Sequence, residues 1–84
     1  MKVLTIYSKP GCHLCDDMKA LVARVVLPLA GAVAVHEVDI SGDANLEAQY
    51  ALEIPVLLVD GKKAAKYRIT EDALARLLDG ARRL

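Results

Sequence analysis

The spacing of apolar residues changes along the chain and predicts a succession of strands and helices. Residues 3–7 form a short β-rich run that is apolar on both faces, which is typical of a strand in the middle of a sheet. A loop follows at residues 8–11, where a Pro-Gly pair breaks regular structure. From Cys12 onward, apolar residues recur at spacings of three and four, which predicts a helix that ends near residues 28–31.

A second strand and a short second helix are predicted in the middle of the chain. Residues 33–40 indicate an edge strand, because their two faces differ only partly in polarity. Residues 41–43 then offer capping side chains for a helix on which Leu46 and Tyr50 lie four residues apart and are therefore neighbours.

The last third of the chain predicts a hairpin and a final helix. Residues 55–59 are apolar, the turn at residues 60–61 is Asp-Gly, and the strand at residues 62–68 carries lysines that protect an exposed edge. Thr70 is a capping residue for a helix with acidic side chains in its first turn. The positions expected to form the buried stripe of that helix are Leu74, Leu77, Leu78 and Ala81.

The resulting order, β-α-β-α-β-β-α, predicts an α/β fold. A helix joins the first two strands, so these should be parallel with a right-handed crossover. The last two strands should form an antiparallel hairpin. We therefore expect one domain over residues 1–84, with a four-stranded mixed sheet flanked by helices.

Composition narrows the class of protein. The 84 residues are 55% hydrophobic without Phe or Trp, which supplies an aliphatic core and excludes disorder. The 11 basic and 11 acidic residues cancel, so bulk charge does not favour nucleic acid as a partner. The N-terminus turns polar too early for a signal peptide, and no apolar stretch is long enough to span a membrane. We expect a cytoplasmic monomer whose thiols meet a reducing environment.

The segment Cys12-His13-Leu14-Cys15 is the candidate for chemistry. Cysteines at this spacing in a first helical turn are close enough for a disulfide, with Cα atoms about 5.5 Å apart. As a structural staple such a short loop would contribute only about 2 kcal/mol, so reversible redox chemistry is the better explanation. A zinc site needs about four ligands, and only His13 and His36 could join the two cysteines, so we expect no metal. Haem attachment would require histidine where Asp16 stands.

The two cysteines should differ in reactivity. Backbone N–H groups at a helix start stabilise a thiolate, and Lys9 lies three residues before Cys12. We therefore expect the pKa of Cys12 to lie below the ordinary thiol value of about 8.5, although Asp16 opposes the shift. Cys15 falls one turn inside the helix and should be less exposed. His13 either tunes Cys12 and relays protons to it, or is simply an exposed polar residue.

Two further features leave alternatives open. Pro55 either begins a strand, where no ladder donor is needed, or forms a cis bond with Ile54 that faces the Cys12 loop. A basic strip is either a solvated sheet edge or a docking surface for an acidic partner or for glutathione carboxylates. This strip consists of Lys62, Lys63, Lys66 and Arg68.

Together these segments resemble a known family. Residues 7–15 read Tyr-Ser-Lys-Pro-Gly-Cys-His-Leu-Cys, and they are followed by Glu-Ile-Pro at residues 53–55 and by the Asp-Gly turn. This combination is similar to glutaredoxins of the thioredoxin-fold superfamily, and most closely to short bacterial glutaredoxin-like proteins. The resemblance covers nearly the whole chain.

The resemblance implies roles for individual residues. Cys12 would be the nucleophile and Cys15 the resolving thiol. Lys9 would contact a carboxylate of glutathione or of another substrate. Pro55 would be cis, and the backbone of Ile54 would hold the substrate like an added strand.

The chain also departs from the usual glutaredoxin pattern. His13 and Leu14 stand where proline and an aromatic residue are usual, and Gly11 replaces the tryptophan of thioredoxins. The Gly-Gly turn and the Ser/Thr-Asp pair that grip the glutamyl end of glutathione are missing. Thr70 and Glu71 could partly substitute for that pair.

We therefore expect a thiol–disulfide oxidoreductase without a tightly bound cofactor. Its substrates would be disulfides or mixed disulfides of proteins or small molecules. Glutathione is a candidate co-substrate, and a thioredoxin-type reductase is a candidate partner. The alternative is a thioredoxin-fold binding module without enzyme activity, which would carry a shared iron–sulfur cluster or dock a partner.

Overall fold

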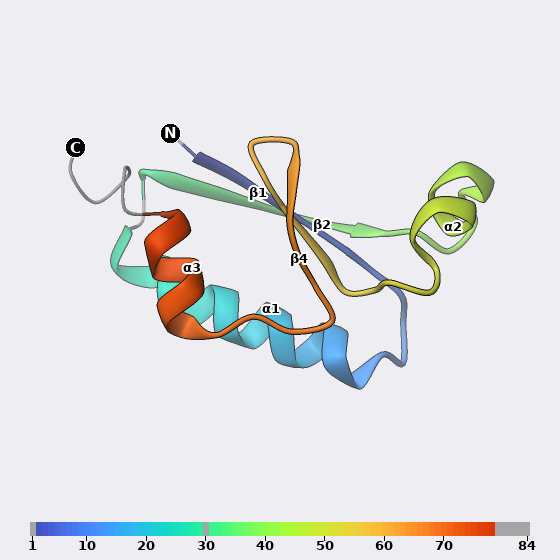
Figure 1. The fold of residues 1–84 in the computed structure, drawn as a ribbon, viewed down its shortest axis with the longest axis horizontal. Coiled ribbons are helices and arrows are strands. Elements are labelled where there is room, and N and C mark those ends of the chain that lie inside the picture. Colours follow the sequence, from blue (N-terminus) through green and yellow to red (C-terminus); the bar gives the residue numbers. More distant parts are fainter. Residues whose placement is uncertain (1, 30, 79–84) are drawn as a thin grey trace.

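The computed structural model describes residues 2–29 and 31–78, and its elements follow the predicted order (Figure 1). The elements are β1 (Lys2–Ser8), α1 (His13–Val26), the 3₁₀ turn η1 (Leu27–Leu29), β2 (Val33–Asp39), α2 (Ala44–Tyr50), β3 (Val56–Val59), β4 (Lys62–Lys66) and α3 (Glu71–Leu77). The four strands form one sheet in the order β2-β1-β3-β4. β1 is parallel to β2 and antiparallel to β3, and β3 is antiparallel to β4. The predicted mixed α/β sheet is confirmed.

Strand β4 is shorter than the sequence predicts. It ends at Lys66, whereas the apolar and basic pattern suggested a strand through Arg68. Tyr67 adopts a positive φ of 67°, and its N–H donates to the carbonyl oxygen of Pro55 at 2.8 Å. A left-handed residue cannot continue a β ladder, so the chain turns there and leaves the sheet.

Helices α1 and α3 lie side by side over one face of the sheet (Figure 1). The core between them and the sheet consists of Leu4, Ile6, Met18, Val22, Leu57, Leu74 and Leu78. The prediction was wrong for Leu77, which is 38% exposed. Leu74 and Leu78 are one turn apart and both face the sheet, whereas Leu77 lies on the flank of the short helix. The predicted core residue Ala81 lies outside the described residues.

The other face of the sheet is covered mainly at one end. Side chains alternate along β1, so Val3, Thr5 and Tyr7 point away from α1 and are only partly buried. The Tyr7 ring packs on the ring of Tyr50 in α2, with centroids 4.7 Å apart. This contact fixes α2 at the end of the sheet where β1 runs into the Cys12 loop (Figure 1).

The helices of the described part of the chain are too short to span a membrane. None of the helices within residues 2–29 and 31–78 is long and apolar enough to cross a bilayer.

Candidate active site

The cysteine motif lies at one end of the sheet, where several segments meet. β1 ends at Ser8, and the loop that follows leads to Cys12 through Gly11, whose φ of 77° suits glycine. Tyr7 pairs with Val56, so the segment just before β3 lies at the same end of the sheet. The structure therefore brings the residues around position 12 and the residues around position 54 to the same end of the sheet.

Cys12 and Cys15 form a disulfide whose Cα atoms are 5.1 Å apart. Cys12 is the N-cap of α1, with an extended backbone, and its Sγ accepts the backbone N–H of Cys15 at 3.0 Å. This N–H belongs to the first helical turn, where backbone donors have no partner within the helix. The same donor can stabilise negative charge on Cys12 Sγ once the disulfide is reduced.

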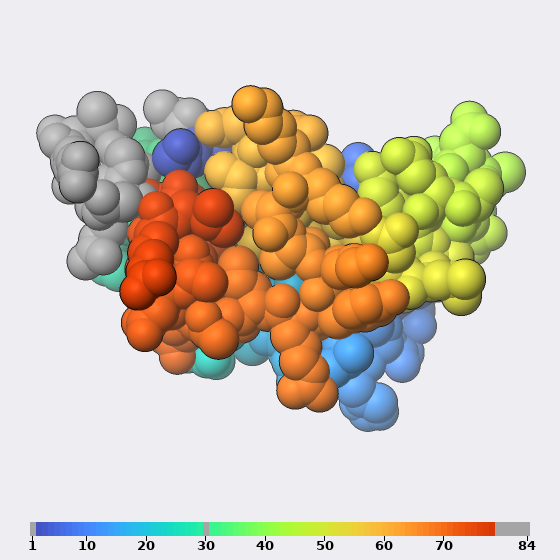
Figure 2. Space-filling model, viewed as in Figure 1, coloured from blue at the N-terminus to red at the C-terminus, as the bar shows by residue number. Residues whose placement is uncertain are grey.

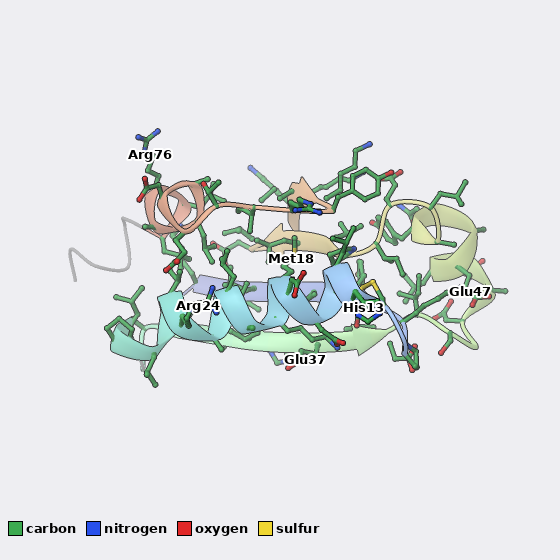
Figure 3. The ribbon with its side chains drawn as sticks, turned by 90° about the horizontal axis from the view of Figure 1, so that it is seen from below. His13, Met18, Arg24, Glu37, Glu47 and Arg76 are labelled. Carbon is green, nitrogen blue, oxygen red and sulfur yellow. A yellow bond between two sulfur atoms is a disulfide. The ribbon has the colours of Figure 1, made fainter. Side chains whose placement is uncertain are left out.

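The two cysteines differ sharply in exposure. Cys15 is 0% exposed, as its place one turn inside the helix predicts, while Cys12 is half-buried. His13 is exposed and lies beside the disulfide (Figure 3). A molecule that approaches this end of the sheet therefore meets Cys12 and His13 before Cys15.

Lys9 does not stand alone near Cys12. Its Nζ lies 3.0 Å from the Oε1 of Glu47 in α2, and the two side chains are 33% and 38% exposed. No spacing rule in the sequence connects these two residues. They meet because α2 is packed against the end of β1 through Tyr7 and Tyr50. The carboxylate of Glu47 thus offsets the positive charge that the sequence places before Cys12.

The segment before β3 is fixed by Tyr67, a residue that sequence reasoning did not single out as functional. The Ile54–Pro55 peptide bond is cis, and Pro55 is buried. The Tyr67 N–H donates to the Pro55 oxygen at 2.8 Å, and the Tyr67 hydroxyl donates to the Leu52 oxygen at 2.7 Å. Tyr67 therefore bonds the segment before β3 at two points, Leu52 at its start and Pro55 at its end.

An ion pair supports the same segment. Lys63 of β4 contacts the carboxylate of Glu53, next to Ile54. The hydrogen bond from Lys63 lowers the pKa of the Glu53 carboxyl below its ordinary value, because it favours the charged form. Lys63 belongs to the basic strip, and its ion pair with Glu53 means that it supports the fold of the site.

Thr70 and Glu71 are not brought to the cysteines. The Thr70 Oγ1 accepts the N–H of Ala73 at 3.1 Å and caps α3. Glu71 lines a hollow with Arg24 and Pro28, near the C-terminal end of α1. A helix of 14 residues is about 20 Å long, so this hollow is far from Cys12 at the other end.

The path of the chain after β4 explains this placement. Residues 67–69 line a groove along α1 with side chains of Leu14, Met18 and Leu21, and only then does α3 begin. Figure 2 shows this segment lying across α1. The expected pairing of Thr70 and Glu71 with a ligand at Cys12 is therefore not supported by their positions.

The described residues contain no cluster of side chains suited to bind a metal ion. Within residues 2–29 and 31–78, no group of three His, Cys, Asp or Glu side chains is arranged to bind a metal ion. His36 is exposed in the middle of β2, opposite Thr5, and does not lie next to the cysteines in the strand register.

A family model now adds to this geometry: the model of the glutaredoxin-like domain (DUF836) matches residues 3–79. The chain belongs to this glutaredoxin-like family. The glutaredoxin-like protein YDR286C homolog of Dictyostelium discoideum is 29% identical over 76 residues, which cover 84% of this chain and 69% of that protein.

Solved structures share the fold of this glutaredoxin-like chain. The X-ray structure of protein XcR50 from X. campestris matches with a TM-score of 0.75 and 34% identity, over 92% of this chain and 96% of that chain. The solution structure of protein Ne2328 from Nitrosomonas europaea matches with a TM-score of 0.75 and 24% identity, over 90% of this chain and 89% of that chain. The second likeness concerns the fold alone. A glutaredoxin-like domain with a C-x-x-C pair at a helix start has the means for thiol redox chemistry.

Proposed function

We propose that this glutaredoxin-like chain is a thiol–disulfide oxidoreductase with Cys12 as nucleophile and Cys15 as resolving thiol. The observation that carries the proposal is the unequal exposure of two cysteines in one helical turn. Cys15 is 0% exposed, and Cys12 is half-buried at the N-cap, where a helix N–H already faces its sulfur. An incoming disulfide therefore reaches Cys12 first.

The proposed reaction has two thiol exchanges. The Cys12 thiolate attacks one sulfur of the substrate disulfide, and the other substrate sulfur leaves as a thiolate that takes a proton from water. The Cys15 thiolate then attacks Cys12 Sγ, which releases the second substrate thiol and closes the Cys12–Cys15 disulfide. Two electrons pass from the dithiol to the substrate. An external thiol or dithiol reductant restores the reduced pair.

We propose that the backbone of Ile54 positions the substrate. Ile54 lies at the same end of the sheet as Cys12, directly before Pro55 and β3, where an extended substrate chain can pair with its backbone. Tyr67 and Lys63 support this role by holding the segment from residue 52 to residue 55. We propose that His13, which is exposed beside the disulfide, modulates proton transfer at Cys12.

We infer that glutathione is a poor co-substrate and that a dithiol protein of the thioredoxin type is the better reductant. Three residues expected to bind glutathione are engaged or distant. Lys9 is paired with Glu47. Thr70 caps α3, and Glu71 lies at the far end of α1. The carboxylates of glutathione therefore meet fewer free donors at Cys12 than the resemblance implies.

Trapping of the first intermediate tests the proposed function. We would treat reduced Cys15→Ser and Cys12→Ser proteins with bis(2-hydroxyethyl) disulfide and measure their intact masses. We expect the Cys15→Ser protein to gain one hydroxyethylthio group and the Cys12→Ser protein to gain none. An adduct on Cys12→Ser alone would reverse the roles. If neither protein forms an adduct, the oxidoreductase proposal fails and the binding-module alternative replaces it.

A further inference from the structure

We propose that Glu47 determines the charge preference of the site, by keeping Lys9 from binding disulfides that carry a carboxylate. The proposal rests on the proposed function, since it concerns the disulfides that Cys12 attacks. Its basis is the 3.0 Å ion pair between Lys9, in the loop before Cys12, and Glu47, in α2. Figure 3 shows Glu47 at the end of the molecule that also holds His13 and the disulfide.

Lys9 is the basic residue that leads directly into the cysteine motif. Lys63, on β4, is taken up by Glu53, and Lys66 lies over the Tyr67 ring at 5.6 Å. Arg68 lines the groove beside Leu14 and is a second cation near the motif, whereas Lys9 lies in the loop that leads directly into Cys12. A carboxylate on a substrate held at Cys12 can therefore bind Lys9. Glu47 already occupies that cation.

The competition favours Glu47 because the helix that carries it is held in place. Asp43 caps α2 through the N–H groups of its first turn, and the Tyr7–Tyr50 contact fixes the helix on the sheet. The internal carboxylate therefore loses little freedom when it pairs with Lys9, whereas a substrate carboxylate must be immobilised. Asp16, exposed in the first turn of α1, adds a further negative charge beside the motif.

The substrate class follows from this arrangement. Disulfides flanked by neutral or basic groups meet no penalty at Lys9, whereas anionic ones must displace Glu47. Partly exposed ion pairs are weak, so the discrimination should be roughly two- to fivefold. The structure assigns to this site protein disulfides with neutral or basic neighbours, in preference to small anionic mixed disulfides.

A pair of small disulfides tests the role of Glu47. In the Cys15→Ser background, we would measure the rate of adduct formation at Cys12 with neutral bis(2-hydroxyethyl) disulfide and with anionic 3,3′-dithiodipropionate. Glu47→Gln should raise the rate with the anionic disulfide roughly two- to fivefold relative to the neutral one. Glu47→Asp should keep the ratio close to that of the parent protein, and Lys9→Met combined with Glu47→Gln should remove the gain.

Glu37→Gln is the matched control. Glu37 pairs with Lys19 at 3.3 Å, so the variant removes the same charge from the same kind of ion pair, in the middle of β2 (Figure 3). An equal change of the ratio in Glu37→Gln and Glu47→Gln, or no change in Glu47→Gln, would overturn the proposal. A structural role of Glu47 alone would shift thermal stability without moving the ratio. Failure of the neutral disulfide to form any adduct would instead contradict the proposed function itself.

Discussion

The hydroxyl of Tyr67 donates to the backbone oxygen of Leu52 at 2.7 Å, and so joins the chain after β4 to the chain before β3. Tyr67 reaches that oxygen because its own backbone turns with a φ of 67° and bonds Pro55. Tyr67 therefore holds the segment that carries Ile54 through both its backbone and its side chain.

Tyr67→Phe removes only the hydroxyl of this contact. We expect the free energy of unfolding to fall by about 1 kcal/mol, since a single hydrogen bond contributes about that much. We also expect slower adduct formation at Cys12 with disulfide-containing peptides, because Ile54 is held less firmly. Chemical denaturation and trapping kinetics would measure the two effects, and unchanged values in both would contradict the role given to Tyr67.

Thr70→Ala separates a capping role from a binding role. Loss of the N-cap should lower the free energy of unfolding by about 1 kcal/mol. Because α3 begins beside the far half of α1, the KM for a glutathione mixed disulfide should stay the same. A Thr70→Ser variant, which keeps the capping oxygen, should regain the stability. A raised KM in Thr70→Ala would show that Thr70 takes part in binding.

Leu74 and Leu77 provide a matched pair on one helix. Leu74 is 0% exposed in the core, so Leu74→Ala should cost about 2–5 kcal/mol of unfolding free energy. Leu77 is 38% exposed, and Leu77→Ala should cost about 1 kcal/mol or less. Urea denaturation of both variants gives the comparison. Equal losses would show that both leucines face the core, as the sequence pattern alone suggested.

The Glu53–Lys63 pair predicts a pH dependence of stability. The hydrogen bond from Lys63 holds the pKa of Glu53 in the folded protein below its ordinary value of 4.5. The stabilisation is therefore fully present above pH 4.5 and is lost as the pH falls through the lower, folded-state pKa. The difference in stability between the parent protein and Glu53→Gln should shrink on acidification below pH 4.5. A difference that is constant across this range would contradict the pairing.

Features set by local sequence could be predicted before the structure. The order of elements follows from apolar periods, and the place of Cys12 at a helix start follows from the break at residues 8–11. The caps at Asp43 and Thr70 are likewise local, since each side chain bonds an N–H two or three residues on.

Features set by packing could not be predicted in this way. Lys9 meets Glu47 only because α2 docks against the end of β1, and no period or spacing encodes that contact. The turn at Tyr67 interrupts a segment whose composition suits a strand. After that turn, residues 67–69 run along α1, and Glu71 lies near the C-terminal end of α1. The order of motifs along the sequence does not reveal this path.

A redox titration of the Cys12–Cys15 pair tests the proposed oxidoreductase most directly. The protein would be equilibrated with dithiol buffers of graded potential, and the oxidised fraction would be read by thiol alkylation and intact mass. We predict one reversible two-electron transition with a midpoint between about −120 and −270 mV, the range of dithiol oxidoreductases. A midpoint below about −300 mV, as in structural disulfides, or a pair that never oxidises, would contradict the proposal.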